Sequence, residues 1–283
     1  MASHTYGELR VQAIAALRSS GVQDAQIDVR ILLSYASGLS SSELIMSGQD
    51  AVPPDVAEKL LSFIARRKNQ EPVAYIVGEQ AFWSMVFKLN KHVLIPRPET
   101  EGVVEQALAL LGKQENARIL DVGTGSGAIL ISLLHELPTA TGWGIDISEN
   151  ALEVARQNAK LLGVANRCTF ETSDFLRDVR GRYDIVVANP PYITGAAMQA
   201  LPPDVGLYEP HLALSGGADG LNAYKSIIND LPNALTAGGD VVFEIGYDQK
   251  TTVCNLLADA GAANIICQQD LAGHDRVISA TFC

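Results

Sequence analysis

From Ala117 onward the chain alternates short apolar segments with helical patterns, and this alternation restricts the fold more than any other feature. Consecutive strands joined by helices lie parallel in one sheet that is covered on both faces. The closing pair, residues 264–269 and 277–282, is joined by a short turn at Gly273 and must be antiparallel. The earlier strands are expected at residues 118–122, 142–146, 168–173, 183–188 and 240–246. We therefore predict an α/β fold with a seven-stranded, mostly parallel sheet whose last strand is antiparallel.

The region before this sheet has a different character. From Thr5 to about Gln70 the apolar residues follow a helical period, and no strand pattern is present. The last expected helix begins at Pro53-Pro54 and ends in the basic cluster Arg66-Arg67-Lys68. Such a cluster is typical of the solvated end of a helix, where the helix dipole favours cations. We interpret this bundle as a substrate-recognition domain, with a purely structural appendage as the alternative.

Three domains are expected in all. Glu71-Pro72 ends the last helix, and residues 82–96 suggest a hairpin that turns at Asn90-Lys91. We place a helical domain at residues 1–74, a β-hairpin linker at residues 75–96 and the catalytic domain at residues 97–283. In the catalytic domain, Arg97 and the two acids that follow can form one wall of the active site. Arg97 and Thr100 are assigned to the cofactor site.

Composition and charge exclude several classes of function. The chain of 283 residues is 47% hydrophobic and 19% charged, and its formal net charge is −11. Nucleic-acid binders usually present a basic face, so DNA is disfavoured as a substrate. No apolar run approaches the roughly 18 residues of a membrane span. The first residues, MASHTYGE, lack the profile of a signal peptide, so we expect a cytoplasmic protein without membrane contact. We also expect it to act as a monomer.

The potential metal ligands are dispersed along the chain. Four cysteines and five histidines show no CxxC pair and no grouping of the two residue types. Zinc sites need such close spacings. We therefore expect no metal.

A glycine-rich loop, Asp121-Val122-Gly123-Thr124-Gly125-Ser126-Gly127, follows the first strand of the sheet. Its glycines allow a tight turn close to a ligand, and the helix behind it presents free N–H groups. The pattern Gly123-x-Gly125-x-x-Ala128 also fits a dinucleotide fingerprint. Asp121 favours S-adenosylmethionine over a nicotinamide cofactor, because its charge suits a cationic amino group and repels a pyrophosphate. The candidate cofactor-binding residues here are Asp121, Gly123, Thr124, Gly125, Ser126 and Gly127.

Two further strand ends supply polar or aromatic candidates for the same cofactor. Asp146 closes the second strand, where its carboxylate can accept both ribose hydroxyls, although it would serve NAD equally well. Asp174 and Phe175 close the third strand and can contact the adenine amino group and ring. The alternatives are a turn cap for Asp174 and a core position for Phe175.

The fourth strand ends at Asn189-Pro190-Pro191-Tyr192, where two prolines stop the hydrogen-bonded ladder. The Asn189 side-chain oxygen and the Pro190 carbonyl can each accept one N–H bond from a planar NH2 group, and Tyr192 can stack on it. Such contacts favour the more pyramidal nitrogen that attacks a methyl group. We expect this corner, with Asn189, Pro190 and Tyr192 as catalytic residues, to hold the acceptor; the alternative is a simple turn.

At these residues the chain resembles a known family, the HemK/PrmC release factor glutamine methyltransferases. The glycine loop, Asp146 and the Asn189–Tyr192 corner are similar to class I methyltransferases that modify amide or exocyclic nitrogens. The narrower resemblance rests on Arg66-Arg67, Glu71–Gly78, Phe82-Trp83, Leu94–Glu101, Tyr208-Glu209-Pro210 and Ala213–Leu221. Phe175 departs from a Trp expected in some relatives, and an aromatic ring is kept. The match covers almost the whole chain and is weakest over the N-terminal helices.

This resemblance implies a Rossmann-like methyltransferase domain that binds S-adenosylmethionine through the glycine loop, Asp146, Phe175 and Asn189. It implies N5-methylation of the glutamine in the Gly-Gly-Gln loop of bacterial peptide-chain release factors, docked in part by the helical domain. The substrate glutamine would lie on Asn189, Pro190, Pro191 and Tyr192. Relatives that modify a ribosomal protein tend to read Pro-Arg-Ser-Pro, whereas this chain reads Pro96-Arg97-Pro98-Glu99-Thr100.

Three alternatives remain open. One is glutamine methylation of a ribosomal protein. Another is an adenine- or cytosine-amino DNA methyltransferase, which uses a similar corner but must hold phosphates and flip a base. The third is a cofactor-binding regulator without catalytic activity.

Overall fold

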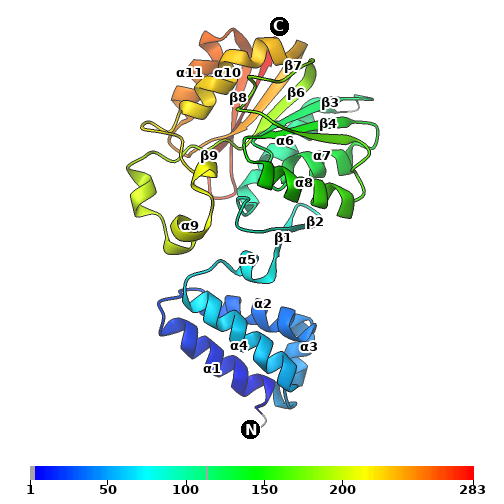
Figure 1. The fold of residues 1–283 in the computed structure, drawn as a ribbon. Coiled ribbons are helices and arrows are strands. Elements are labelled where there is room, and N and C mark those ends of the chain that lie inside the picture. The colour runs from blue at the N-terminus through cyan, green and yellow to red at the C-terminus, as the bar shows by residue number, and fades with distance from the viewer. Residues whose placement is uncertain (1–3, 113) are drawn as a thin grey trace. The chain divides into compact units, whose positions relative to one another are not determined.

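The structure, a computed structural model, describes residues 4–112 and 114–283 (Figure 1). Residues 1–3, which belong to the segment expected not to be a signal peptide, lie outside the described residues. The chain forms two compact units. The helical unit contains the chain up to Gly78 together with Pro202–Tyr208, and the sheet unit contains Glu79–Leu201 and Glu209–Cys283.

The helical unit packs its helices around one apolar core. Leu17, Leu32 and Leu60, from three different helices, are fully buried in it. Capping boxes begin two of the helices, with Thr5 and Ser40 each accepting a backbone N–H bond from the glutamate three residues later. The helices before the sheet are α1 Tyr6–Arg18, α2 Ala25–Ser37, α3 Ser41–Met46, α4 Pro54–Lys68 and α5 Val73–Val77, with a 3-10 turn η1 at Ser47–Gln49.

The basic end of α4 is only partly the solvated surface expected from the sequence, because Lys68 is exposed but Arg67 is not. Arg67 is buried, and its Nε lies 2.7 Å from Oδ2 of Asp28 in α2. Arg66 forms a two-pronged ion pair with Glu71, with its Nε 2.9 Å from Oε2 and its Nη2 2.5 Å from Oε1. The prediction was wrong for Arg67 because an acid distant in sequence neutralises it inside the bundle.

The boundary between the two units lies after Gly78, four residues beyond the expected end of the helical domain at residue 74. Ile76 of α5 packs in the core of the helical unit, so α5 belongs to that unit. Gly78 ends α5 with a left-handed φ of 81°, a conformation that glycine adopts at little cost. The span expected as a hairpin linker, residues 75–96, is therefore divided between the two units.

The hairpin itself turns earlier than expected. Strands β1 Glu79–Phe82 and β2 Met85–Lys88 pair antiparallel around a turn at Trp83-Ser84, not around Asn90-Lys91. Trp83 adopts a left-handed φ of 56°, which is uncommon for a bulky residue. Its backbone N–H donates to Oε1 of Glu101 at 2.7 Å, and its indole N–H donates to Oε1 of Glu136 at 2.8 Å. These tertiary bonds offset the strained turn, and the local sequence gives no sign of them.

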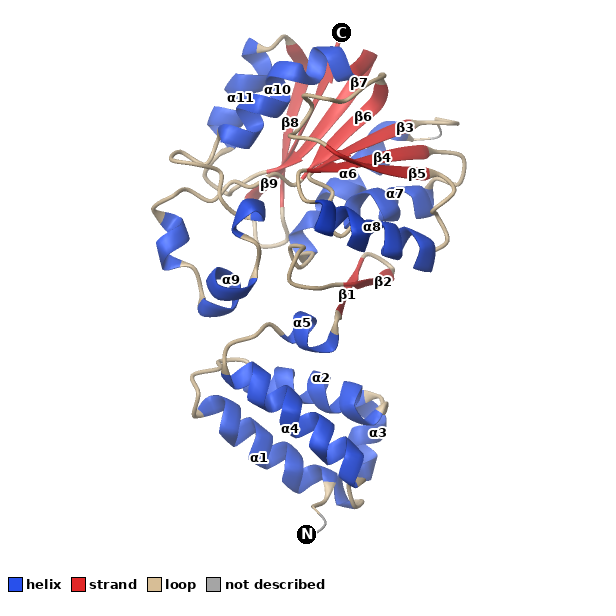
Figure 2. Cartoon of the chain, in the orientation of Figure 1, coloured by secondary structure: helices blue, strands red, loops and turns tan. Residues whose placement is uncertain are grey.

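The sheet unit is built on seven strands in the order β5-β4-β3-β6-β7-β9-β8 (Figure 2). All neighbours pair parallel except β9, which runs antiparallel to both β7 and β8. The predicted fold class is confirmed. The strands are β3 Arg118–Val122, β4 Thr141–Asp146, β5 Cys168–Thr172, β6 Tyr183–Ala188, β7 Leu235–Glu244, β8 Ala262–Gln269 and β9 Asp275–Phe282.

Helices cover both faces of this sheet. One face carries α6 Glu101–Leu111, α7 Ala128–Glu136 and α8 Glu149–Leu161, and the other carries α10 Asn222–Ala234 and α11 Lys250–Asp259 (Figure 2). The central strands are therefore buried on both sides, which explains the continuous apolar run of β6. No helix among the described residues is long and apolar enough to cross a membrane. The shorter elements are η2 Pro98–Thr100, η3 Ala197–Ala200, α9 Pro203–Tyr208 and η4 His211–Ala213.

Candidate active site

A cavity of about 500 Å³ lies at the carboxyl ends of β3, β4, β5 and β6, the edge where open α/β sheets bind ligands. Its volume is in the range of small-molecule and cofactor sites. Segments around His92–Leu94 and Pro210–Ala213 also line it. Six sequence-predicted residues reach its wall: Gly123, Gly125, Asp146, Asp174, Phe175 and Pro191.

The glycine loop turns over the end of β4. The backbone N–H groups of Gly123 and Thr124 both donate to the carbonyl of Ile145, at 2.8 and 2.9 Å. Gly127 combines a left-handed φ of 82° with a position where an added Cβ would lie 2.7 Å from Cδ1 of Ile131. The left-handed φ favours glycine there, whereas the contact with Ile131 could be relieved by that side chain, and the turn allows α7 to begin directly behind the loop.

Asp146 ends β4 and lines the cavity with its carboxylate already oriented. Its Oδ2 accepts the N–H of Gly125 at 3.0 Å, and its Oδ1 accepts the N–H of Ser148 at 2.9 Å. Burial raises the pKa of Asp146, and these backbone bonds oppose the rise. Each oxygen keeps a further lone pair, so the group can accept two hydroxyls of a ribose.

Asp121 lies beneath the glycine loop and is 1% exposed. Its Oδ2 accepts the hydroxyl of Thr124 at 2.7 Å, whereas its Oδ1 has no hydrogen-bond partner among the described residues. Burial raises the pKa of this carboxyl to about 7. A buried polar atom without a partner is costly, and a cationic amino group or the water that hydrates it would satisfy this one. Asp121 does not itself line the cavity, but Gly123 and Gly125 of the loop above it do, and an unsatisfied acceptor beneath this loop fits the cationic amino end of S-adenosylmethionine.

The end of the glycine loop at Ser126 is held by a buried asparagine that the sequence analysis did not identify. The side chain of Asn158 donates to the carbonyl of Ser126 at 2.9 Å. The same side chain pairs with both backbone groups of Lys88 in β2, at 2.8 and 3.0 Å. Asn158 therefore joins the hairpin to the cofactor loop, and neither segment predicts it from sequence alone.

Phe175 is presented to the cavity by an unusual backbone. Its φ is 51°, and the hydroxyl of Ser173 donates to its carbonyl at 2.6 Å. This bond supports a left-handed conformation that an aromatic residue rarely adopts. The neighbouring Asp174 also lines the cavity and pairs with Arg177 at 3.3 Å.

The Asn189 corner is held by side chains from two segments that are distant in sequence, at Thr100 and at Glu244. Nδ2 of Asn189 donates to Oγ1 of Thr100 at 3.0 Å, and that hydroxyl donates to Oε2 of Glu244 at 2.5 Å. The phenol of Tyr192 donates to Oε1 of Glu244 at 3.3 Å. Pro190 is buried, and Pro191 contributes to the wall of the cavity.

Two residues assigned to the cofactor from sequence have other partners in the structure. Thr100 is 4% exposed and bridges Asn189 and Glu244, rather than lining the cavity. Arg97 forms an ion pair with the buried Glu209, whose Oε2 also accepts the backbone N–H of Ile95 at 3.1 Å. Arg97 thus joins two segments that border the cavity, residues 92–94 and 210–213.

Glu244 is the main residue of this hydrogen-bonded corner that the sequence analysis did not identify. A signal was available, because an acid that closes a buried apolar strand is the same pattern that drew attention to Asp121 and Asp146. Glu209 stood inside the Tyr208-Glu209-Pro210 motif, but nothing local indicated its partner. No cluster of metal-ligating side chains occurs within residues 4–112 and 114–283.

Comparison with known proteins agrees with this geometry. Residues 8–78 match the family described as PrmC N-terminal domain, and residues 113–261 match the family described as Methyltransferase domain. A methyltransferase structure from Pyrococcus furiosus has a TM-score of 0.53 at 14% identity, over 71% of this chain and 90% of that chain. The sheet and the cavity at its edge therefore define a class I S-adenosylmethionine-dependent methyltransferase.

The relatives in sequence narrow the class. A release factor glutamine methyltransferase of Cereibacter sphaeroides is 42% identical over 268 residues, covering 95% of both chains. That of Bradyrhizobium diazoefficiens is 42% identical over 273 residues, covering 94% of this chain and 91% of the relative. The chain belongs to the release factor glutamine methyltransferase family, as its resemblance predicted, and its methyl donor is S-adenosylmethionine.

Proposed function

We propose that this protein methylates the side-chain amide N5 of the glutamine in the Gly-Gly-Gln motif of bacterial peptide-chain release factors. The observation that carries the proposal is the Asn189 corner beside the cofactor cavity, in a chain 42% identical to release factor glutamine methyltransferases. S-adenosylmethionine, when bound, supplies an electrophilic methyl group. The residues of the chain hold and orient the two reactants.

The acceptor residues act on a poor nucleophile. An amide nitrogen is delocalised, so it gains reactivity only as its geometry becomes pyramidal. Oδ1 of Asn189 and the carbonyl of Pro190 accept the two N–H groups of the substrate amide and favour that geometry. These contacts strengthen toward the transition state, which is how they accelerate the reaction. No general base is required of the chain, because the nitrogen's remaining protons become acidic once it is alkylated.

The cofactor residues fix the position of the donor. Asp146 accepts the ribose hydroxyls, Asp121 balances the cationic amino end, and Phe175 packs against the adenine. Holding both reactants in one orientation turns a bimolecular step into an effectively intramolecular one. The candidate cofactor set remains Asp121, Gly123, Thr124, Gly125, Ser126, Gly127, Asp146, Asp174, Phe175 and Asn189, with Arg97 and Thr100 acting through their partners.

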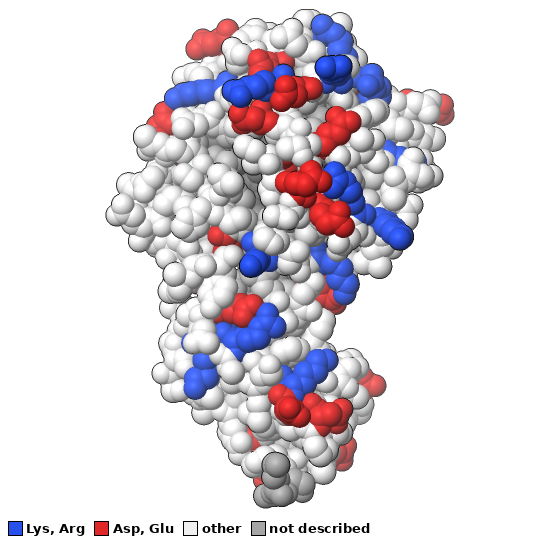
Figure 3. Space-filling model, in the orientation of Figure 1, with Lys and Arg blue, Asp and Glu red and all other residues white. Residues whose placement is uncertain are grey.

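DNA is the weaker candidate substrate. The net charge is −11, and acidic and basic side chains are interspersed on the face drawn in Figure 3 rather than gathered into a basic track. Arg66 and Arg67 are engaged by Glu71 and Asp28. A DNA methyltransferase needs cations for phosphates, so salt-dependent DNA binding would be needed to restore that candidate.

The proposal includes a cytoplasmic enzyme that acts as a monomer. Size-exclusion chromatography with light scattering tests this part, and a dimer with higher specific activity would contradict it.

The test of the whole proposal is mass spectrometry of a purified release factor incubated with the protein and S-adenosylmethionine. We expect a gain of about 14 Da, one methyl group in place of hydrogen, on the Gly-Gly-Gln peptide. The gain should be absent with Asn189→Ala. If the release factor is unchanged while a ribosomal protein gains a methyl group, the second substrate replaces the first. If no glutamine substrate yields S-adenosylhomocysteine, a regulatory cofactor-binding role is favoured.

A further inference from the structure

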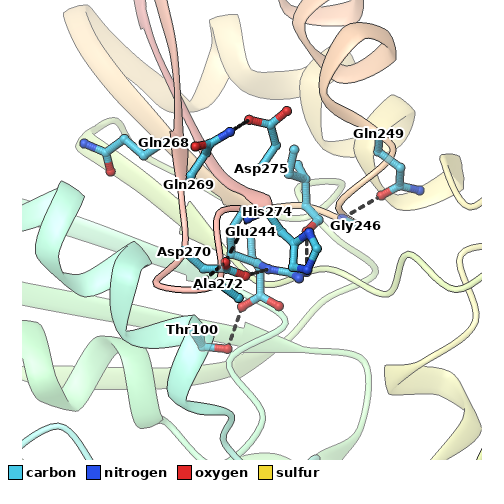
Figure 4. A network of polar contacts seen from close by, with 12 residues as sticks. Thr100, Glu244, Gly246, Gln249, Gln268, Gln269, Asp270, Ala272, His274 and Asp275 are labelled. Carbon is cyan, nitrogen blue, oxygen red and sulfur yellow. Dashed lines mark hydrogen bonds and ion pairs between the residues drawn. The ribbon is translucent and has the colours of Figure 1, made fainter.

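Glu244 is a buried acid at the carboxyl end of β7, and it faces the acceptor corner only through other side chains. It is 2% exposed. Figure 4 shows its carboxylate bonded to the hydroxyl of Thr100. Its backbone carbonyl accepts the phenol of Tyr224 at 2.8 Å, which fixes the strand end. Burying a carboxylate costs free energy unless both of its oxygens accept hydrogen bonds, so the partners of Glu244 show how the fold stabilises it beside the site.

The hydrogen bonds around Thr100 have one consistent direction. A threonine hydroxyl carries a single proton and can donate only one bond. In its ionised form Glu244 can only accept, so at 2.5 Å the Thr100 proton then goes to Oε2 of Glu244. Oγ1 of Thr100 must then accept from its other neighbour, so Asn189 offers its NH2 group to Thr100. The side-chain oxygen of Asn189 is thereby turned away from Thr100.

The second oxygen of Glu244 is engaged in the same way. Oε1 accepts the phenol proton of Tyr192 at 3.3 Å, so both carboxylate oxygens act as acceptors. Burial raises the pKa of Glu244, while the Thr100 bond, the nearby charge of Arg276 and the Tyr192 bond lower it, and Glu99 raises it. The guanidinium of Arg276 is itself held by the carbonyl of Ile245 at 2.9 Å.

We propose that Glu244 is a positioning residue that fixes, through the hydroxyl of Thr100, which end of the Asn189 amide faces the substrate. The proposal rests on the proposed function, since it concerns the amide that accepts the glutamine N–H bond. With the Thr100 proton committed to Glu244, Asn189 presents Oδ1 to the acceptor. If residue 244 instead donates a hydrogen bond to Thr100, the Thr100 hydroxyl can donate to Oδ1 of Asn189. The NH2 group of Asn189 would then face the NH2 group of the substrate glutamine.

Glu244 does not serve as a general base in this arrangement. Both of its oxygens already accept hydroxyl protons, and its side chain does not line the cavity. Its effect on the reaction is therefore expected in turnover through Asn189, not in a proton transfer of its own. A neighbouring residue, Gln249, holds the backbone of the same corner by donating to the carbonyl of Tyr192 at 3.2 Å.

The experiment compares matched substitutions. Glu244→Gln keeps the shape of the side chain but adds a donor, so it can reverse the hydrogen bonds at Thr100. We expect its kcat for the release factor to fall about tenfold or more, with the dissociation constant for S-adenosylmethionine within about twofold of wild type. The kcat of Thr100→Val should fall similarly, whereas the kcat of Thr100→Ser, which keeps the hydroxyl, should stay close to that of wild type. Equal turnover of Thr100→Val and Thr100→Ser would overturn the proposal.

The control is Ser279→Ala in β9. Ser279 is 3% exposed and accepts a bond from Gln106 at 2.9 Å, so its loss removes a similarly buried hydroxyl bond without a path to Asn189. We expect its melting temperature to fall about as much as that of Thr100→Val and its kcat to match wild type. If Ser279→Ala loses as much turnover as Thr100→Val, the effect is general destabilisation and the proposal is wrong.

A double substitution and a spectrum complete the test. In an Asn189→Ala background, Glu244→Gln should reduce kcat by less than about twofold, since the residue that transmits its effect is gone. A further tenfold loss there would overturn the proposal. The side-chain amide resonances of Asn189 should shift in Glu244→Gln and Thr100→Val and stay unchanged in Thr100→Ser. This readout needs no substrate, so it tests the amide orientation even if the wild-type protein fails to methylate a release factor, which would refute only the proposed function.

Discussion

The cofactor side of the site and its acceptor corner are built in opposite ways. On the cofactor side, backbone groups dominate: glycines turn the loop, and N–H groups of Gly125 and Ser148 hold the Asp146 carboxylate. At the acceptor corner, side chains hold side chains, through Asn189, Thr100 and Glu244. The first kind of site depends on a short continuous motif, whereas the second depends on residues brought together by the fold.

This difference has a consequence for how each side responds to mutation. A site made of backbone amides loses little ligand affinity when a nearby side chain is substituted. The exceptions are the few side chains that contact the ligand directly. A chain of side-chain hydrogen bonds transmits every change in donor or acceptor to its end. We therefore expect substitutions on the cofactor side to change affinity and those at the acceptor corner to change turnover.

Asn189→Ala should give the largest effect and separates the two sides most clearly. Removing the amide that orients the acceptor should lower kcat by about 10² to 10³-fold, as for a lost oxyanion-hole donor. The dissociation constant for S-adenosylmethionine, measured by calorimetry, should change by only a few-fold. Near-normal turnover in this variant would refute the role of the corner.

Asp146→Ala, on the cofactor side, should have the converse effect, a loss of cofactor affinity with little loss of turnover. It loses two charge-assisted hydrogen bonds to the ribose, so cofactor affinity should weaken about 50-fold, while kcat at saturating cofactor changes little. Glu149→Ala, which removes an exposed acid just beyond Ser148, is the control and should bind normally. An unchanged dissociation constant for Asp146→Ala would contradict the ribose contact.

Asp121→Asn should remove a pH dependence of cofactor binding. In the free protein burial raises the pKa of Asp121 to about 7, so the group must lose a proton before it can balance a cationic amino end. Wild-type affinity should therefore strengthen about tenfold as the pH rises from about 5.5 to 7. The Asn variant should lack this rise.

The folding stability of the cofactor-free protein should depend on pH in the opposite direction to its cofactor affinity. The raised pKa means that the folded state binds the Asp121 proton more tightly than the unfolded state does. Stability is thus lost as pH rises from the ordinary aspartate value of 3.8 through about 7. Melting temperatures of wild type and Asp121→Asn should diverge over that window, and parallel curves would show that the group is not buried as described.

Arg97→Met should give the smallest effect. It breaks the ion pair with Glu209 that joins two segments bordering the cavity, and leaves Glu209 bonded to the N–H of Ile95. We expect cofactor affinity to fall about threefold, through faster dissociation, because Arg97 acts on the cavity only through Glu209, whose buried carboxylate is left without its cation. The exposed pair of Lys250 and Asp275 supplies the control, and Lys250→Met should leave dissociation unchanged. Equal rates of cofactor dissociation for Arg97→Met and wild type would show that this ion pair does not support the cofactor site.

The same contrast explains what the sequence could predict. Strands β3 and β6 were expected at the residues where they occur, because a buried parallel strand is a continuous apolar run. The glycine loop and Asp146 were recognisable because their function depends on local spacing. The start of β7 was missed by five residues, since Gly238 and Gly239 resemble a loop although β9 pairs with this segment.

Errors concentrate where partners are distant in sequence. The bond between Thr100 and Glu244 joins residues 144 positions apart, so the local sequence does not indicate it. The hairpin turn at Trp83 was missed because Glu101 and Glu136 stabilise it from other elements. Local patterns contain no information on such pairs, so only the fold reveals them.

The short helix α9 has a consequence for how this protein can be divided or recombined. The chain passes between the two units at Gly78-Glu79, at Leu201-Pro202 and at Tyr208-Glu209. Within the helical unit, Tyr208 donates its phenol to the carbonyl of Asn69 at 2.7 Å. A gene fragment ending at Gly78 would therefore leave part of its own unit behind in the other half. Domain shuffling at that junction is disfavoured, and the two units are expected to be inherited as a pair.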